Sequence, residues 1–401
     1  MEPTIGARIK KLRTGAMTQQ ELATAAEVSV DLIRKLEQGR RHTASIGSLH
    51  RIARALDVDT AELLAKPTTL QTGDTESGVV AIRRVLTSVD DLIAEPDADG
   101  ELITVEEAER TVNYLWGAYW AGRYDLLGSL LPEALTQLRA VTRAASADAR
   151  PHAMEALASG LQVAGDTLVH LGQTDAAFLA VREALTAARD GDNAFLSAAV
   201  RASVAWQMLV QGRLRDSEQV ALTAAAAIEP RGKVTPSHLA VYGILTVTAA
   251  TAVAREGRTD RTTELLDVSR EYAGRLGTDQ AACQTTFGPA KVAMMAVDCH
   301  VVLENFPEAL KAARHLDREA PLSLATRARH LADVAYSQTR LGQDSRALDT
   351  LLTMESIAPD WIKYQTLPRQ TVHELIERDR RRVHGSRLRE LARRLGADRS
   401  A

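Results

Sequence analysis

The first 65 residues alternate short apolar stretches at helical spacing with polar breaks, and this pattern predicts five short helices. Their apolar positions are Ile5, Ile9 and Leu12, then Leu22, Ala23 and Ala26, then Leu32, Ile33 and Leu36, then Ile46, Leu49, Ile52, Ala53 and Leu56, and finally Leu63 and Leu64 within 59–64. Thr18 is a good N-cap for the second helix, and Glu21 completes a capping box. Ser29 caps the third helix, and Gly39 ends it.

The connection between the second and third helices is so short that the two must cross steeply, which leaves the third helix protruding. A protruding helix with a polar outer face and a basic exit suits the major groove of DNA. The stretch resembles the helix-turn-helix of the lambda repressor/Cro type, the XRE class, in the run MTQQELA at 17–23, in Val28-Ser29 and in Ile33-x-x-Leu36-Glu37-x-Gly39. Glu27 departs from the family, which usually has glycine in this turn.

Helical spacing and the resemblance together assign the residues that would contact DNA. They are Thr18, Gln19, Gln20, Ser29, Val30, Asp31, Arg34, Lys35, Arg40 and Arg41. Thr18 and Gln19 open the second helix, where backbone N–H groups meet phosphate, and the family pattern implies that Gln19 also steadies the recognition helix. On the outer face of that helix, Arg34 can pair with guanine, Asp31 can accept from cytosine, and Val30 can touch a thymine methyl. The remaining basic side chains would neutralise phosphate.

Residues 66–78 are polar, contain Pro67 and Gly73, and show no apolar period. We therefore predict a linker here, between a DNA-binding domain at 1–65 and a second domain at 79–401. From Val79 onward Ala, Leu, Arg and Glu dominate, and no alternating strand pattern of useful length occurs. The predicted fold class is all-α.

The second domain repeats one kind of turn between apolar helical runs. The turns begin at Gly122, Gly172, Gly212, Gly257, Glu304 and Gly342. Glycine would end one helix, and the Asp, Ser or Thr that follows would cap the next. Successive turns are 38 to 50 residues apart, a period that indicates a solenoid of helical hairpins.

These hairpins resemble tetratricopeptide-type (TPR) repeats in small residues such as Ala177 and Ala184 after Gly172, and Ala309 after Asn305. A helix-turn-helix followed by TPR-like repeats resembles a set of regulators from high-GC bacteria, whose repeat domain senses a signal. The segment 286–292 and the ending at 386–392 are typical of that set. The last helix, 386–395, places leucines on one face and arginines on the other, which suits a terminal cap.

Aromatic residues make up only 4% of the chain, yet they cluster in one helix at 114–124 and recur in later first helices of the hairpins. In a curved solenoid those helices line the concave surface. The predicted effector-binding residues are Trp116, Tyr119, Trp120, Arg201, Trp206, Gln207, Tyr242, Phe287, Lys291 and Asp298. Core packing of the aromatic residues is the alternative interpretation, and the sequence leaves it open.

A related group of regulators clamps the backbone of a signalling peptide with Asn side chains on the concave face. Beyond residue 66 this chain has only Asn113, Asn193 and Asn305, so an Asn ladder for peptide capture is not predicted. A small molecule, a peptide or a partner protein therefore remains open as the signal.

Charge is spread unevenly along the chain. Residues 6–56 carry ten Lys or Arg against four acids, whereas the whole chain has a net charge of −3. A basic head on an acidic body is typical of a DNA-binding domain joined to a regulatory domain. The two cysteines, Cys283 and Cys299, give neither a disulfide framework nor a metal pattern, which fits a reducing cytoplasm.

Other functional classes lack support in the sequence. No run of about 18 apolar residues and no signal peptide are found, so no membrane contact is expected. No phosphate-binding loop and no dinucleotide fingerprint occurs, so we expect no cofactor, no metal and no enzymatic activity. The predicted function is a homodimeric transcriptional regulator that binds double-stranded DNA at a pseudo-palindromic operator. The alternative is an adaptor whose repeats grip a partner protein and whose basic domain anchors the pair to nucleic acid.

Overall fold

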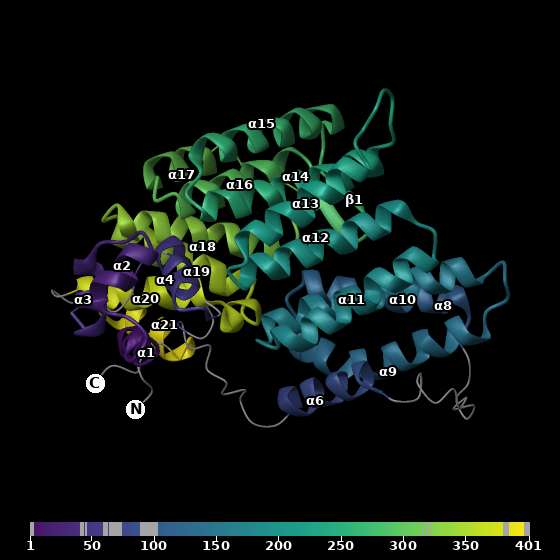
Figure 1. Cartoon of the computed structure of the whole chain (residues 1–401), viewed down its shortest axis with the longest axis horizontal. Helices are drawn as coiled ribbons and strands as arrows, with labels where there is room; N and C mark the ends of the chain where they lie inside the picture. The colour runs from purple at the N-terminus through teal and green to yellow at the C-terminus, as the bar shows by residue number, and fades with distance from the viewer. Residues whose placement is uncertain are drawn as a thin grey trace.

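The computed structural model describes residues 4–40, 44, 46–58, 63, 74–88, 103–314, 316–317, 320, 322–379 and 385–396. Most of these residues lie in helices or in the turns that join helices, which confirms the all-α prediction (Figure 1). Among the described residues, the N-terminal helices have a hydrophobic core of their own, and the helices of the remainder of the chain share other hydrophobic clusters.

The N-terminal domain contains α1 (Ile5–Arg13), α2 (Gln19–Ala25), α3 (Val30–Glu37) and α4 (Ile46–Ala55). Their shared core includes Ile9, Leu22, Ile33, Leu36 and Leu49, which are the positions that the helical spacing indicated. The predicted capping box of α2 and the predicted cap of α3 are both present. The predicted fifth helix, 59–64, lies outside the described residues except for one buried leucine.

The helix α6 (Asp74–Leu86) begins inside the stretch 66–78 that the sequence indicated as a linker, so residues 74–78 are helical. The helices that follow form the repeat domain, in which each first helix is paired with a second one. The pairs are α8 (Val105–Trp120) with α9 (Tyr124–Ala144), α10 (Arg150–His170) with α11 (Thr174–Asp190), α12 (Ala194–Val210) with α13 (Leu214–Ala227), α14 (Pro236–Arg255) with α15 (Thr259–Leu276), α16 (Pro289–Val302) with α17 (Phe306–Ala313), α18 (Leu324–Arg340) with α19 (Asp344–Ile357), and α20 (Thr366–Arg378) with α21 (Gly385–Arg394).

The turns inside the hairpins confirm the sequence prediction in one respect and correct it in another. All six predicted positions have positive φ: Gly122, Gly172, Gly212, Gly257, Glu304 and Gly342. The predicted caps are wrong, because the residue at each following N-cap makes no side-chain capping bond. Acidic residues such as Asp175 lie two positions after the N-cap, in the first turn of the helix, where a negative charge interacts favourably with the positive end of the helix dipole.

The first helices of successive hairpins contact one another and form an inner layer, with the second helices outside (Figure 1). This inner layer curves until its two ends meet, because α18 and the short 3-10 helix η1 (Trp361–Tyr364) reach the first hairpin. At that junction a Cβ atom on Gly122 would lie 2.9 Å from Cβ of Trp361, and the Tyr364 hydroxyl donates to Asp125. The repeat domain is therefore a closed ring of helical hairpins.

The expectation that the second domain would lack strands needs a small correction. Two three-residue strands, β1 (Gln280–Ala282) and β2 (Thr285–Phe287), pair antiparallel with Ala282 opposite Thr285. The two turn residues between them have positive φ, 45° at Cys283 and 62° at Gln284. The amide of Gln284 donates to Asn113 of α8 at 3.1 Å, so the hairpin bridges α8 and the segment before α16.

Within the part of the chain that the structure describes, one helix, α14, is long and apolar enough to cross a bilayer by length and composition, and 72% of its apolar window is buried within the fold. Its position in the inner layer accounts for its composition, since both faces contact other helices. The last helix, α21, buries Leu388 and Leu391 and exposes its arginines, as the sequence indicated for a terminal cap.

Candidate functional site

The outer face of α3 is the candidate DNA-reading surface. Asp31, Arg34 and Lys35 are exposed on it, whereas Ile33 and Leu36 are buried in the domain core. Val30 is only half-buried and packs against the core, which limits its reach toward a base. The helical spacing thus places the polar face outward, as a reading helix requires.

Two of the predicted DNA-contact residues form an ion pair with each other. The Lys35 ammonium lies 2.7 Å from a carboxylate oxygen of Asp31, one turn away on the same helix. The hydrogen bond from Lys35 is the main cause that lowers the pKa of the Asp31 carboxyl. Arg34 lies between them in the sequence and is exposed, so it is the side chain best placed to reach a guanine edge.

The C-terminal end of α3 is held by a half-buried cluster of Arg13, Gln19 and Glu37. Arg13 donates to both carboxylate oxygens of Glu37, at 2.6 and 3.0 Å, and the Gln19 amide donates to one of them at 2.7 Å. Burial opposes the ionisation of Glu37, but the hydrogen bonds from Arg13 and Gln19 outweigh it and lower the pKa of that carboxyl. Because the three side chains come from α1, α2 and α3, the cluster fixes the direction in which α3 protrudes.

A glycine on α1 completes this support. A Cβ atom on Gly6 would lie 1.7 Å from the Leu36 carbonyl oxygen, so α1 and α3 are in backbone contact there. The sequence analysis assigned Gln19 a steadying role but missed Gly6, Arg13 and Glu37. The helical pattern alone gives no signal for a contact between residues 30 positions apart.

The other predicted DNA-contact residues fall into three groups. Thr18 and Ser29 accept hydrogen bonds from backbone N–H groups as helix caps. Gln20 and Arg40 are exposed. Arg41 lies outside the described residues.

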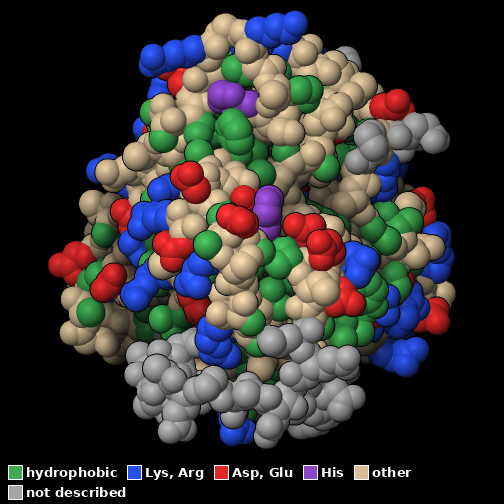
Figure 2. Space-filling view, turned by 90° about the vertical axis from the view of Figure 1, so that its right-hand side faces the viewer, with side chains coloured by type: hydrophobic (Ala, Val, Ile, Leu, Met, Phe, Trp, Pro, Cys, Tyr) green, Lys and Arg blue, Asp and Glu red, His purple; other side chains and the backbone are tan. Residues whose placement is uncertain are grey.

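The surface of the repeat domain differs from this basic head. Figure 2 shows one face of the molecule, on which acidic and basic side chains are interspersed and acids gather near the centre around a histidine. On that face no continuous field of Lys and Arg is visible among the described residues. A phosphate backbone would find no continuous basic surface on this face.

The ring encloses a cavity of about 260 Å³, lined mainly by the first helices of the hairpins. All four tryptophans of the chain, at 116, 120, 206 and 361, line it. Because tryptophan is so scarce in this sequence, its concentration around one cavity is a stronger signal than its burial alone.

One side of the cavity, the aromatic wall, is formed by Trp116, Tyr119, Trp120, Tyr124, His170, Trp206 and Trp361. The rings contact one another, with Trp116 and Trp120 stacked at 5.9 Å and Tyr124 and His170 stacked at 4.4 Å between centroids. Asp166 lies among them and accepts from the Ser203 hydroxyl at 2.9 Å. Burial raises the pKa of Asp166 to about 7.

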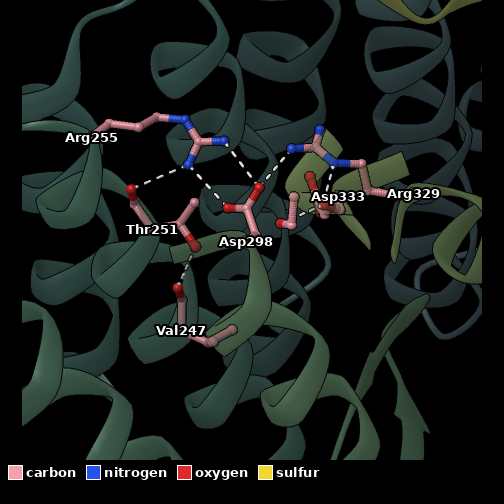
Figure 3. A network of polar contacts seen from close by, with 7 residues as sticks. Val247, Thr251, Arg255, Asp298, Arg329 and Asp333 are labelled. Atoms are coloured by element: carbon pink, nitrogen blue, oxygen red, sulfur yellow. Dashed lines mark hydrogen bonds and ion pairs between the residues drawn. The ribbon is translucent and has the colours of Figure 1, made fainter. Parts of the chain in front are cut away.

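A second part of the lining, the charged wall, consists of Arg255, Lys291, Asp298, Arg329 and Asp333. Figure 3 shows four of these residues, Arg255, Asp298, Arg329 and Asp333. Asp298 lies between two guanidinium groups, 3.2 Å from Arg255 and 2.6 Å from Arg329. Arg329 also lies 3.3 Å from Asp333. Burial opposes the ionisation of Asp298, but the two arginines outweigh it and lower its pKa, whereas burial raises the pKa of Asp333 to about 7.

The fifth member of the charged wall, Lys291, is half-buried. Burial lowers the pKa of its ammonium to about 8, against the attraction of Asp279 and Asp298 and with a further lowering by Arg329. Asp279 is engaged elsewhere, because its carboxylate accepts from the backbone N–H groups of Ala290 and Lys291 at 2.9 and 3.0 Å.

The structure brings together six of the ten predicted effector residues around the cavity: Trp116, Tyr119, Trp120, Trp206, Lys291 and Asp298. The other four lie elsewhere. Phe287 is fully buried against Gly243, and Gln207 is buried behind Asp166. The ring centroids of Tyr242 and Tyr272 lie 4.6 Å apart, and the Arg201 guanidinium donates to a carbonyl of its own helix.

The sequence analysis missed Asp166, Arg255, Arg329 and Asp333. Three of them, Asp166, Arg255 and Asp333, share a signal that was available, because each is a charged residue within an apolar stretch of a first helix. A charge at such a position must find a partner or a ligand when the helix is buried on all sides. Their meeting at one cavity depends on the curvature of the ring.

Comparisons with known proteins bear on the N-terminal domain. Residues 4–65 match the family model of a helix-turn-helix domain. A comparison with curated proteins finds no match. Among solved structures, the chain is similar to a Rap protein complexed with competence and sporulation factor, at 16% identity and a TM-score of 0.42, over 90% of this chain and 99% of that one. A likeness at that level assigns no function to the repeat domain.

Proposed function

We propose that this protein is a sequence-specific transcriptional regulator with a lambda repressor/Cro-type head, whose affinity for DNA is set by a signal bound in the cavity of the repeat domain. The observation that carries the proposal is the exposed polar face of α3, held by the Glu37 cluster on a basic helix-turn-helix domain. The cavity supports the second half, because it combines an aromatic wall with a few convergent charged groups, as ligand sites do.

One recognition helix reads only a few base pairs, so we propose a homodimer on a pseudo-palindromic operator in the cytoplasm. The ligand would act by favouring one curvature of the ring, and it can shift the balance only by its difference in affinity for the two shapes. The adaptor alternative has less support, because aromatic and charged groups converge on a cavity of about 260 Å³, a size that suits a small molecule or a short peptide segment. We also propose that the chain has no enzymatic activity of its own.

Fluorescence anisotropy tests the DNA-binding half of the proposal. The full-length protein would be titrated into a labelled duplex from upstream of its own gene and into a scrambled duplex, both at near-physiological salt. A regulator should prefer its operator by on the order of 10³ or more. Equal binding to both duplexes, with and without extracts that could contain the signal, would contradict the proposal and favour the adaptor.

A further inference from the structure

We infer that the cavity takes a small organic anion, with a flat apolar body against the aromatic wall and a single carboxylate- or sulfonate-type group beside Lys291 and Arg329. This inference rests on the proposed function only in taking the cavity as the signal site.

The first argument is the charge balance of the charged wall. Three cations, Arg255, Lys291 and Arg329, face two carboxylates, Asp298 and Asp333. Both carboxylates are used by the two arginines, at 2.6 to 3.3 Å. Asp279 and Asp298 attract the Lys291 ammonium, but among the described residues no carboxylate lies within ion-pair distance of it. The wall therefore has one cation more than it has carboxylates.

A half-buried ammonium without a charged partner is unfavourable, because water no longer solvates it fully. A bound anion would supply the partner that the protein leaves out, through a charge-assisted hydrogen bond. Arg329 would add to the attraction, since its side chain is 36% exposed although it contacts both acids. The tendency of Asp333 to hold a proton near neutral pH increases the positive excess further.

The second argument is the shape and chemistry of the aromatic wall. Indole and phenol rings offer broad flat faces, and stacked or edge-on aromatic contacts add to the effect of burying apolar area. The acid on that side, Asp166, is hydrogen-bonded to Ser203 and has a raised pKa, so near neutral pH it is a weaker negative centre than an ordinary aspartate. The two walls together favour a ligand with one apolar and one anionic end.

The anilinonaphthalene pair of dyes provides a matched test. 8-Anilinonaphthalene-1-sulfonate carries one negative charge, and N-phenyl-1-naphthylamine has the same aromatic body without it. Binding of either to the full-length protein should quench tryptophan fluorescence by energy transfer, since every tryptophan of the chain lines the cavity. Each dye would be titrated into the wild type and into three variants.

Lys291→Gln should weaken binding of the sulfonate dye about tenfold, the usual effect of losing a hydrogen bond to a charged group, and leave the neutral dye unchanged. Lys291→Arg should retain the affinity for the sulfonate dye, which separates charge from packing. Lys233→Gln changes the charge equally at an exposed loop position and should affect neither dye. Circular dichroism would verify that each variant is folded.

Two results would overturn the inference and leave the cavity as a ligand site: an unchanged affinity of Lys291→Gln for the sulfonate dye, or an equal loss for both dyes. If neither dye quenched the tryptophans of the wild type, the cavity would not be a ligand site at all. The ligand-binding half of the proposed function would then fail as well, while the DNA-binding half would still be tested by anisotropy.

Discussion

Replacing Gly6 with alanine sets two effects of opposite sign against each other. Gly6 lies in the first turn of α1, where alanine favours the helix by roughly 1 kcal/mol. However, the new Cβ atom would lie 1.7 Å from the Leu36 carbonyl oxygen and 2.3 Å from its carbon. A normal contact of this kind is about 3.3 Å, so α1 and α3 would have to separate by about 1.6 Å.

The obstacle is a backbone carbonyl, which cannot rotate away as a side chain could. The cost of overpacking should therefore exceed the gain in helix propensity. Overpacking of a well-packed core costs about 1–3 kcal/mol, and occasionally more. Because a displacement of this size puts the cost at the upper end of this range, about 3 kcal/mol, and the gain in helix propensity is about 1 kcal/mol, we expect the N-terminal domain to lose about 2 kcal/mol of stability. The displacement also pulls on the Glu37 cluster, so operator affinity should fall together with stability.

Hydrogen exchange of the full-length protein, followed by mass spectrometry, measures this domain directly. Peptides from α1 and α3 of Gly6→Ala should exchange faster than those of the wild type. The control is Gly117→Ala, at an exposed position in α8 with no atom within 4 Å of the new Cβ, where protection of α8 should increase. Unchanged or slower exchange of α1 and α3 in Gly6→Ala would refute the backbone contact as the reason for this glycine.

Three further predictions follow from the same structure. Affinity for the sulfonate dye should fall as the pH rises from 6 to 9, first near pH 7, where Asp166 and Asp333 lose their protons and add negative charge to the cavity, and then near pH 8, where Lys291 loses its proton. A flat profile up to pH 9.5 would show that the charge of Lys291 is not used. Glu304→Gly should raise the free energy of unfolding by about 1 kcal/mol, since a φ of 59° strains any side chain but suits glycine, as in the other hairpin turns. Urea titration measures this change. A loss of stability would mean that the contacts of the Glu304 side chain outweigh the backbone strain. Arg34→Ala should cost about 1–3 kcal/mol of binding free energy on the operator and relax base preference, while Arg40→Ala should weaken binding to all duplexes equally. Anisotropy with operator and scrambled duplexes distinguishes the two effects. Identical behaviour of the two variants would show that Arg34 does not read a base.

The sequence predicted well those features that depend on neighbours in the chain. The capping box at Thr18 and Glu21, the cap at Ser29 and the turn positions at Gly122 and Gly172 are set by residues within a few positions of one another. The buried faces of the helices also followed from spacing, because a period of 3.6 residues fixes which side chains share a face. The prediction of capping residues for the second helices was wrong, because an acidic residue near the start of a helix can stabilise it through the helix dipole without a capping hydrogen bond.

The same distinction between features set by neighbours in the chain and features set by long-range packing applies to the two candidate sites. The exposed positions of α3 followed from helical spacing, but their support by Gly6 and Arg13 depends on how α1 crosses α3. In the repeat domain, Lys291 and three of the four tryptophans were identified from composition and position, whereas Trp361 was missed. Phe287 was assigned to the wrong surroundings because an aromatic side chain in a first helix or beside it can face either the cavity or the core.

The sequence by itself determined the helices, their order, the basic head and the scarcity of aromatic residues. Only the tertiary structure decided that the hairpins close into a ring, and closure is what makes a cavity out of residues as distant as Trp116 and Trp361. The physical reason is that curvature results from many small packing angles between adjacent hairpins. Each angle depends on side chains from two helices at once, so no local pattern records their sum. The same accumulation brings Arg255, Asp298 and Arg329 from three helices to one wall, beside Lys291, which forms no ion pair with any residue that the structure describes.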